Sequence, residues 1–443
     1  MDLIKRFRLN HHSRIALVGS GGKTTLMFQL ARDFGSRVIC TTTTHLAVEE
    51  LKSADQYLTL ENLKDLPGSE SELTGNIIVI TGPEGETDRV IGPSSEILAA
   101  LDKLAKTWNC PIIIEADGAR NLPIKAPAAH EPSIPEFANV VITVIGLSGL
   151  GKPLNGDWVH RPELYSSLVD LPLGSTLASE HLVKELISPR GGLKNIPEKA
   201  RKILFINQID SFPNWKAFHS HMDVLLSFYH SVGFSVLEDQ MLLEVHEQIA
   251  GIVLAAGESS RFGEPKQLLD WFGVPLVKHV AEIAIKGGLS PVLVVSGADH
   301  DAVSQTLQGN PVNIVCNTSW QAGQSTSIQA GIQALPETVG GVVFLLVDQP
   351  LIPPKLIDLI REKQSRTPSA IILPKIEGKS ANPVFFDRQV FEELLQLEGD
   401  IGGRALFEKY PPRGVPWEDS ASQMDIDTPE DYQRIRFESG SEG

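Results

Sequence analysis

The chain has 443 residues, of which 42% are hydrophobic and 21% are charged, and its formal net charge is −16. At roughly 100 to 200 residues per domain, this length predicts two or three domains with cores of their own, and the composition excludes a largely disordered chain. The acidic balance argues against a protein that binds nucleic acid or lies on an anionic membrane, because both surfaces would repel it.

The same composition points to a cytoplasmic protein. No apolar run approaches the ~20 residues that span a bilayer. The first residues, MDLIKRFRLNHHS, hold too few apolar side chains for a secretory signal. Cys40, Cys110 and Cys316 stand at the ends of apolar runs and form no C-x-x-C pair, which favours reduced thiols in the core over disulfides or a metal site.

Short runs rich in Val and Ile recur through the first half of the chain and predict buried strands. They cover residues 15–20, 38–44, 76–82, 111–118, 140–146 and 202–210. Between them, residues 24–34 and 94–108 have apolar side chains at helical spacing. This alternation predicts a doubly wound, three-layer α/β domain, in which helices cover both faces of a parallel sheet.

The first predicted strand runs into the loop GSGGKTT (19–25) and then into a predicted helix. A standard P-loop needs a glycine at position 17, where this chain has Leu17, so the loop is a shortened form. It resembles the compact G-T-x-G-K-T-T loop of Mur-type ligases. Helix amides and a lysine attract phosphate, and a threonine hydroxyl contacts Mg²⁺, so we predict a P-loop-like site for ATP or GTP. The predicted contacts are Gly19, Gly21, Gly22, Lys23, Thr24 and Thr25.

Two carboxylates follow a later strand of the first half. Glu115 and Asp117 in IIIEADGAR stand where P-loop proteins carry a carboxylate for metal binding, and we predict that they bind Mg²⁺. Together with this segment, GSGGKTT, TTTTH (41–45) and HEPSIPE (130–136) resemble the YqeC family, described as selenium-dependent hydroxylase accessory proteins. The resemblance covers about residues 3–238. It implies an NTP-dependent step in maturing the cofactor of a molybdenum hydroxylase, whose apoenzyme would be a partner.

A second set of strands follows the polar stretch EVHEQ (244–248), and we predict domains at 1–243 and 248–443. The predicted strands are 249–257, 291–297, 312–317, 341–350 and 370–376. The first of them enters the loop LAAGESSRFGEPKQLL (254–269), in which small residues let a ligand approach the backbone and two basic residues suit a triphosphate. The predicted nucleotide contacts are Leu254, Ala255, Ala256 and Gly257, and the predicted catalytic cations are Arg261 and Lys266.

This loop resembles the signature of the MobA-like nucleotidyltransferases, and within them the molybdenum cofactor cytidylyltransferases (MocA-like). The resemblance covers about residues 249–435 and implies a Rossmann-like, GT-A-like domain that transfers CMP from CTP to molybdopterin with Mg²⁺. It assigns nucleotide contacts to Gly323 and Ser325 in NTSWQAGQSTSIQAGI (317–332). It assigns metal binding and catalysis to Asp348 in VDQP, with Asp425 and Asp427 in MDIDTPEDY as further metal ligands. Ala256 and Gln267 match the cytidylyl pattern.

Other interpretations of these residues remain open at this stage. The run D-T-P-E-D is also a helix start, with Thr428 as N-cap and Pro429 in the first turn. The transferase could use GTP or a sugar phosphate, or the protein could be a non-enzymatic molybdopterin chaperone. Zinc is not expected, because no H-E-x-x-H occurs, His246-Glu247 lacks a second histidine, and His219-x-His221 has no cysteine nearby.

Overall fold

The structure is a computed structural model that describes residues 2–85, 88–258 and 262–440. The chain divides into two compact units, Met1–His246 and Glu247–Gly443, which are described separately below. In the part of the chain that the structure describes, no helix combines the length and the apolar character needed to cross a bilayer.

The first unit is built on a mainly parallel sheet whose central strand leads into the glycine loop. In sheet order, the described strands are β13 (Met241–Glu247), β12 (Ser231–Val236), β11 (Arg201–Asn207), β9 (Val140–Gly146), β1 (Arg14–Gly19), β7 (Ile112–Glu115), β2 (Val38–Thr42), β5 (Ile77–Thr81) and β4 (Gln56–Thr59). β1 pairs in parallel with both β7 and β9. The Ile- and Val-rich runs form the buried middle of this sheet because their side chains are covered on both faces.

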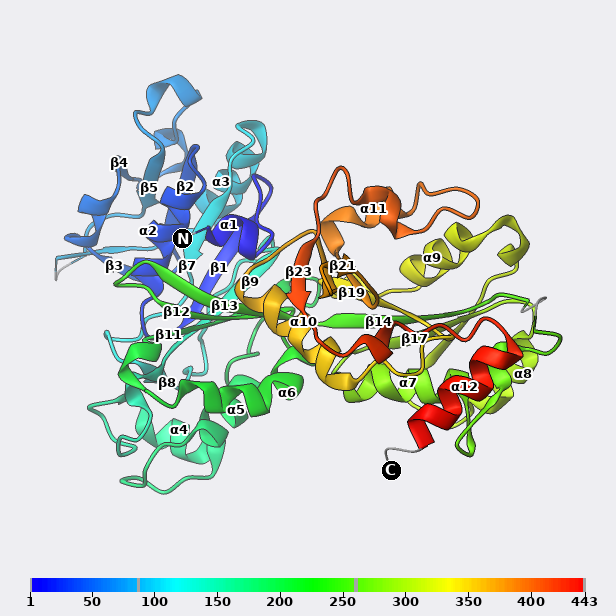
Figure 1. The fold of residues 1–443 in the computed structure, drawn as a ribbon. Coiled ribbons are helices and arrows are strands. Elements are labelled where there is room, and N and C mark those ends of the chain that lie inside the picture. The colour runs from blue at the N-terminus through cyan, green and yellow to red at the C-terminus, as the bar shows by residue number, and fades with distance from the viewer. Residues whose placement is uncertain (1, 86–87, 259–261, 441–443) are drawn as a thin grey trace. The chain divides into compact units, whose positions relative to one another are not determined.

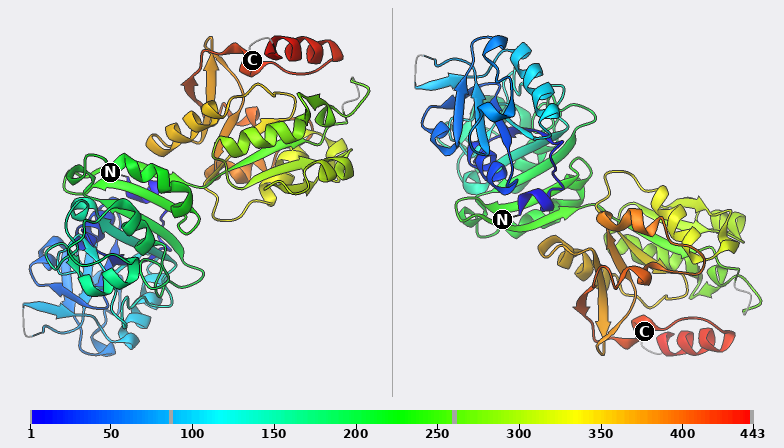
Figure 2. Two further views of the ribbon diagram at one scale, coloured as in Figure 1. Left: turned by 90° about the horizontal axis from the view of Figure 1, so that it is seen from below. Right: turned by 90° about the horizontal axis from the view of Figure 1, so that it is seen from above.

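Helices cover both faces of this first sheet, as Figure 1 and the two views of Figure 2 allow the reader to follow. The helices are α1 (Leu3–Arg6), α2 (Lys23–Asp33), α3 (Ser95–Thr107), α4 (Pro162–Val169), α5 (Ser179–Leu186) and α6 (Met222–Leu226). α1 and α2 pack on one face, in a core with Leu17 and Ile142. α3 packs with Ile112 and Ile114, and α4 to α6 pack with Leu204, on the other face. The unit therefore has three layers, as predicted.

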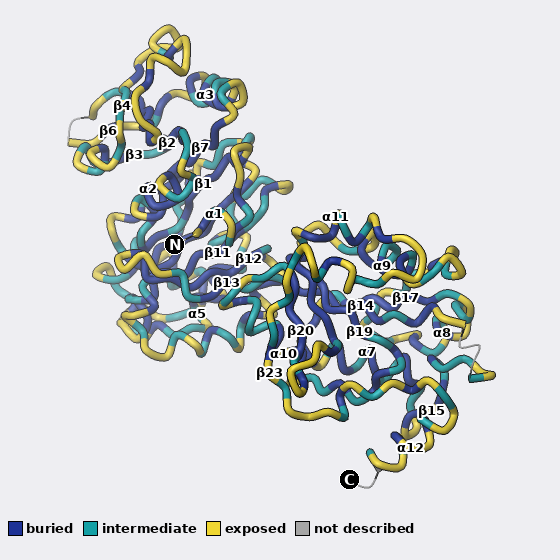
Figure 3. The backbone as a smooth tube through the Cα atoms, turned by 45° about the horizontal axis from the view of Figure 1, so that its top comes forward, coloured by how far each residue is buried: buried dark blue, intermediate teal, exposed yellow. Residues whose placement is uncertain are grey.

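The second unit contains a mixed sheet. In sheet order, its described strands are β18 (Asn313–Cys316), β17 (Val292–Ser296), β14 (Ile249–Ala255), β19 (Gly341–Leu346), β22 (Val384–Asp387), β20 (Ile371–Ile376) and β21 (Lys379–Ser380), with β23 (Arg413–Pro416) beside β20. β18, β17, β14 and β19 are parallel, whereas β22 is antiparallel to β19 and β20. The buried course of β14, β17 and β19 is visible in Figure 3.

Two helical layers enclose the second sheet. Its described helices are α7 (Leu276–Lys286), α8 (His300–Thr306), α9 (Gln324–Gln333), α10 (Pro354–Arg366), α11 (Phe391–Leu394) and α12 (Pro429–Gly440). α7, α8, α10 and α12 share one apolar core with the sheet, and α9 and α11 share the other. The second unit is therefore also a three-layer α/β fold, with β14 and β19 adjacent at its centre.

The polar stretch 244–248, to which the sequence analysis assigns no element, lies mostly in β13, an edge strand of the first sheet. One local expectation, a core position for all three cysteines, needs correction. Cys316 is exposed rather than in the core, because it lies at the end of β18, the edge strand of the second sheet. Cys40 and Cys110 are buried, and all three cysteines are free thiols. Burial raises the pKa of the Cys40 thiol to about 12, which makes it unreactive.

Candidate functional site

In the second unit, the glycine-rich loop begins where β14 ends, next to the end of β19. Leu254 of β14 lies opposite Leu346 of β19, so the loop after β14 and the Val347-Asp348 segment emerge side by side at the carboxyl edge of the sheet. Phosphate ligands of doubly wound folds bind at this edge. A cavity of about 540 Å³ opens there. It is lined by all four predicted loop contacts, Leu254, Ala255, Ala256 and Gly257, and by Lys266, Gly323, Asp348 and Asp427.

Lys266 is the point at which the predicted charged residues meet. Its Nζ lies 3.3 Å from Asp348 Oδ2 and 3.2 Å from Asp427 Oδ1, and it donates a hydrogen bond to the carbonyl of Ile426 at 2.9 Å. Three segments distant in sequence are thereby brought together around one cation. The predicted catalytic Arg261 lies outside the described residues.

Asp348 has the environment of a metal ligand. Burial, together with the nearby charge of Asp425, raises the pKa of its carboxyl above the ordinary value, while Lys266 opposes the shift. Its Oδ1 is buried and accepts no hydrogen bond from the described residues. A buried carboxylate oxygen without a donor is costly unless a cation binds it. The site therefore favours a bound cation beside Asp348.

Of the two residues predicted to contact nucleotide at the start of α9, Gly323 lines the cavity and Ser325 does not. A Cβ at Gly323, where φ is +109°, would lie 2.3 Å from the carbonyl of Gly399, so only glycine fits this close approach. Ser325 is 1% exposed, and its amide donates to the carbonyl of Gly399 at 3.1 Å. Ser325 thus holds the segment at Gly399 against the start of α9 and does not line the cavity. Sequence reasoning missed Trp320, Ser327 and Asp400, which do line it.

Asp425 and Asp427 face different surroundings although only Ile426 separates them. Asp427 lines the 540 Å³ cavity, whereas Asp425 accepts a hydrogen bond of 2.6 Å from Gln349 Nε2 and lines a second cavity of about 590 Å³. The helix-start interpretation of this segment also holds. At the start of α12, the backbone amide of Thr428 donates to the Asp431 carboxylate, and the backbone amide of Asp431 donates to the Thr428 hydroxyl. The helix start therefore fixes the position from which Asp427 reaches Lys266.

Gln267, one of the two residues that match the cytidylyl pattern, is buried beneath the loop. Its Nε2 donates to Asp299 Oδ2 at 2.8 Å and reaches the Gly257 carbonyl at 3.5 Å. Ala256, the other, is 6% exposed and lines the cavity. Gln267 therefore supports the loop through hydrogen bonds and, like Ala256, also lines the cavity.

In the first unit, the loop after β1 is held against the neighbouring strand β9. A Cβ on Gly21, where φ is +78°, would lie 2.4 Å from the amide nitrogen of Gly146, so this crossing requires glycine. Three loop amides are already used within the protein: those of Gly19, Ser20 and Gly21 donate to Asp117 Oδ2, the Val144 carbonyl and the Leu122 carbonyl. Among the described residues, the amides left to meet an anion are that of Gly22 and those of the first turn of α2.

The N-terminus of α2 has the features of a phosphate site. It begins at Lys23, directly after Gly22, and no side chain among the described residues caps it. First-turn amides of a helix need partners from outside the helix, and an anion gains about 0.3–1 kcal/mol there. Thr24 and Thr25 lie in this turn, and the Thr24 hydroxyl donates to Glu115 Oε2 at 2.8 Å.

Lys23 lies folded over the loop and is 5% exposed. Its Nζ donates to the Gly19 carbonyl at 2.9 Å and lies 3.3 Å from Asp117 Oδ1 and 3.6 Å from Glu115 Oε1. Burial alone lowers the pKa of Lys23, but the two carboxylates outweigh burial and raise it. Lys23 therefore stays charged, and it neutralises both predicted metal-binding carboxylates of this unit.

Asp117 belongs to a chain of alternating charges that leads away from the loop. Lys125 Nζ lies 2.8 Å from Asp117 and 3.0 Å from Glu131, which also receives two bonds from Arg161 at 2.7 and 2.8 Å. Burial alone would raise the pKa of Glu131, but these cations lower that pKa to about 2. The network ends at a cavity of about 430 Å³ lined by Arg89, Gly118, Arg120, Glu131, His160 and Arg161. Three of its six lining residues are arginines, which suits an anionic ligand.

Glu185 of α5 lies beside this network and should set a pH dependence of stability. Burial raises its pKa from 4.5 to about 8. Between these values the unfolded chain releases the proton and the folded chain keeps it, so stability falls as pH rises. Glu185→Gln should therefore match wild type near pH 5 and exceed it increasingly toward pH 8, by at most about 1.4 kcal/mol per pH unit. Urea unfolding across this range measures the difference. Glu163→Gln, at an exposed site of α4, is the control, and parallel profiles for Glu185→Gln and wild type would contradict the assignment.

Both units thus have the architecture of nucleotide-binding α/β proteins, with loops that follow a central parallel strand and carry a lysine beside carboxylates. Comparison with known proteins agrees. Residues 15–163 match the YqeC protein family, and residues 251–414 match the MobA-like NTP transferase domain. The chain belongs to these two families, and it is an enzyme of the nucleotidyltransferase class related to molybdenum cofactor nucleotidyltransferases.

Individual relatives match one unit each. The YqeC protein of Escherichia coli (strain K12) is 35% identical over 205 residues, which cover 45% of this chain and 77% of the relative. Nicotine blue oxidoreductase of Paenarthrobacter nicotinovorans is 30% identical over 202 residues, covering 42% and 96%. A probable molybdenum cofactor guanylyltransferase of Bacillus mycoides (strain KBAB4) is 28% identical over 208 residues, covering 44% and 98%.

Proposed function

We propose that the second unit transfers CMP from CTP to molybdopterin and releases pyrophosphate, with Mg²⁺ as cofactor. The observation that carries the proposal is the convergence of Lys266, Asp348 and Asp427 at a cavity lined by the glycine-rich loop. A cation beside two carboxylates at the carboxyl end of parallel strands suits a triphosphate and its metal ion. Similarity to a molybdenum cofactor guanylyltransferase supports the choice of a pterin acceptor.

The protein must position the acceptor phosphate and the triphosphate of CTP and neutralise their negative charges. An oxygen of the acceptor phosphate attacks the α-phosphorus of CTP, the bond between that phosphorus and the bridging oxygen breaks, and pyrophosphate leaves with the bonding electrons. A phosphate monoester is already largely ionised near neutral pH, so no strong general base is needed. Lys266 would stabilise the leaving pyrophosphate by its charge, and positioning would supply much of the remaining rate.

Asp348 and Asp427 fit a hard divalent cation. Carboxylate oxygens are the ligands that Mg²⁺ prefers, and Asp348 Oδ1 accepts no hydrogen bond from the described residues. When bound, Mg²⁺ neutralises charge on the phosphates. Asp425, which accepts the hydrogen bond of Gln349, would shape the second cavity. That 590 Å³ cavity shares Leu254, Gln324, Leu346 and Asp400 with the first, and its Arg404 suits the phosphate of a pterin acceptor.

For the first unit we propose binding of ATP or GTP at the N-terminus of α2. Lys23 would turn from Gly19 and its carboxylates toward the phosphates, and Thr24 with Glu115 would hold Mg²⁺, because their oxygens are already 2.8 Å apart. Asp117 would instead position the loop, since it already bonds the Gly19 amide and Lys125. In this proposal, the basic cavity beside Arg161 receives an anionic second substrate, and a molybdenum hydroxylase apoenzyme is the partner that receives the matured cofactor.

The test is pyrophosphate release by the full chain from CTP, GTP and ATP, with Mg²⁺, in the presence and absence of molybdopterin. We expect release that requires the pterin and is fastest with CTP. Equal or faster release with GTP would contradict the cytidylyl assignment at Ala256 and Gln267, whereas release without pterin would contradict the acceptor. Pyrophosphate release that occurs with a sugar phosphate and not with molybdopterin would also contradict the pterin acceptor. A protein that binds molybdopterin with no release from any triphosphate would be a chaperone.

A further inference from the structure

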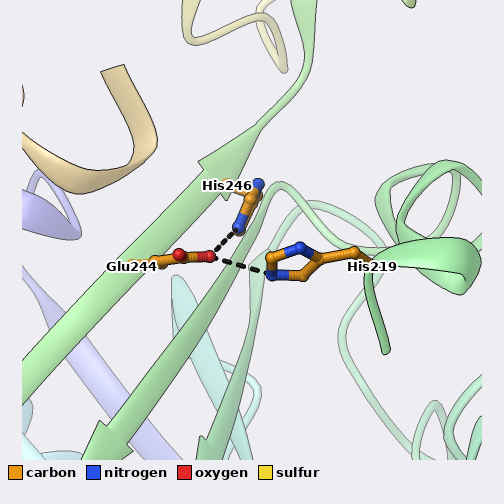
Figure 4. A group of neighbouring side chains, drawn as sticks. All are labelled: His219, Glu244 and His246. Atoms are coloured by element: carbon orange, nitrogen blue, oxygen red, sulfur yellow. Dashed lines mark hydrogen bonds and ion pairs between the residues drawn. The ribbon is translucent and has the colours of Figure 1, made fainter. Parts of the chain in front are cut away.

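Two histidines and a glutamate, which are distant from the glycine loop in the sheet order, come together at the edge of the first unit. His219 lies in the 3₁₀ segment η6 (Trp215–His221), and Glu244 and His246 lie in β13. Side chains two residues apart in a strand point to the same face. Glu244 and His246 therefore both face His219, which reaches them from 25 residues earlier in the chain (Figure 4).

Both imidazoles converge on a single carboxylate oxygen. Glu244 Oε2 lies 2.9 Å from His219 Nε2 and 3.0 Å from His246 Nε2, and one ligand atom from each residue lies within 4.8 Å of the others. His219 Nε2 is buried, and among the described residues it makes no hydrogen bond of acceptable direction despite its closeness to Glu244. The close polar neighbour of this nitrogen is Glu244 Oε2, itself a possible metal ligand.

The surroundings hold the three side chains in place and leave one side open. The Phe234 ring packs edge-on against His219 and His246, at centroid distances of 5.8 and 6.0 Å, and Trp215 packs against His219 at 5.6 Å. The side chain of Glu244 is 4% exposed, whereas those of His246 and His219 are 20% and 35% exposed. Aromatic packing of this kind fixes ligand orientation, and the exposed side admits an ion from solvent.

We propose that His219, Glu244 and His246 bind a divalent transition-metal ion of the zinc class, with a fourth position open to water or a ligand. Two imidazoles and a carboxylate suit Zn²⁺, and three protein ligands with one open position are typical of reactive zinc sites. Zinc bonds of about 2.0–2.2 Å place tetrahedral ligand atoms roughly 3.3 Å apart. The Glu244 oxygen, which lies 2.9 and 3.0 Å from the two imidazole nitrogens, therefore needs to move from each by only a few tenths of an ångström. The ion would tie β13, at the edge of the sheet, to η6.

Metal titration of the full chain, stripped of metal beforehand, tests the proposal. Zn²⁺ is added in a calorimeter in the presence of excess Mg²⁺, which occupies the carboxylate sites of both nucleotide loops. We expect one equivalent of tight binding. His219→Asn and His246→Asn should each weaken it by about 100-fold or more, since loss of even a supporting group costs 10- to 100-fold. His221→Asn is the matched control. It lies in the same segment but contacts Ser179, at 3.4 Å, instead of the cluster.

Cobalt substitution gives a second, spectroscopic measurement, which reports the coordination of the bound ion. Co²⁺ bound by wild type should absorb in the visible range with the strong bands of a four-coordinate ion, and both ligand variants should lose these bands while keeping the circular dichroism of wild type. The control His221→Asn and the second-unit variant Asp348→Asn should retain them. Absence of a tight equivalent in wild type, or unchanged binding in both folded ligand variants, would overturn the proposal and leave the cluster as an ion pair.

Discussion

Replacing Asp348 by asparagine should lower the rate of pyrophosphate release by about 10³-fold, because a bound metal ion is worth several kcal/mol and each 1.4 kcal/mol is tenfold in rate. Asparagine keeps the shape of the side chain and removes the charge that holds the cation. The fold itself disfavours the ionised form of Asp348, whose pKa is raised by burial. The variant should therefore unfold at the same denaturant concentration as wild type, or at a higher one.

A lower rate together with unchanged stability distinguishes loss of a metal ligand from damage to the fold. Initial rates of pyrophosphate release with saturating CTP, pterin and Mg²⁺ measure the first part, and urea unfolding measures the second. Asp358→Asn is the matched control, because Asp358 lies exposed on α10 beside Lys355 in the same unit. If Asp348→Asn kept its rate within about tenfold of wild type, Asp348 would not be the principal metal ligand.

Lower pH should weaken the same site earlier than it weakens an ordinary aspartate site. A metal ion binds the ionised carboxylate, and burial raises the pKa of Asp348, so protons compete for it at a higher pH than for an exposed aspartate. A second consequence concerns Asp425, whose pKa burial also raises. Asp425 also accepts a hydrogen bond from Gln349. Because protons and Mg²⁺ compete for the ionised carboxylates, added Mg²⁺ should restore activity at low pH.

Much of the fold follows from local sequence signals, and the exceptions lie at sheet edges. Buried strands such as β1 and β14 are short apolar runs that lead into glycine loops. A run of this length and composition is typical of a buried strand. β13 was not predicted because its polar residues, such as Glu244 and His246, interrupt the apolar run that marks a buried strand. Cys316 was misplaced because a short apolar run does not reveal whether its strand is central or at an edge.

The two sites differ in how far the sequence could lead. Loops before a helix are contiguous motifs, so the segments holding Lys23 and Lys266 could be found directly. The meeting of Lys266 with Asp427, 161 residues apart, follows from the resemblance and not from any local spacing. His219 and His246 carry no such motif. They lie close together because β13, the edge strand of the first sheet, lies beside η6. Tertiary packing, not local sequence, determines that contact.

Replacing Lys23 by methionine should abolish triphosphate binding in the first unit and also destabilise it. Methionine keeps most of the length and loses the charge. Glu115 and Asp117 then lie buried without the cation between them, and removal of one partner of a buried ion pair costs about 3–5 kcal/mol. Lys125 still contacts Asp117, so the loss should fall mainly on Glu115. Urea unfolding measures the stability, and binding of a fluorescent ATP or GTP analogue measures the site, with exposed Lys64→Met as the control.

A second substitution separates the two effects. In Lys23→Met/Glu115→Gln the unpaired buried carboxylate is neutral, so most of the lost stability should return, because replacing both members of a buried pair by groups of similar shape is often close to neutral. Nucleotide binding should not return, since the charge that meets the phosphates is still missing and Glu115 no longer supports Mg²⁺ beside Thr24. Restored stability with restored binding would mean that the α2 amides hold the nucleotide alone, and that Lys23 serves only to neutralise the carboxylates.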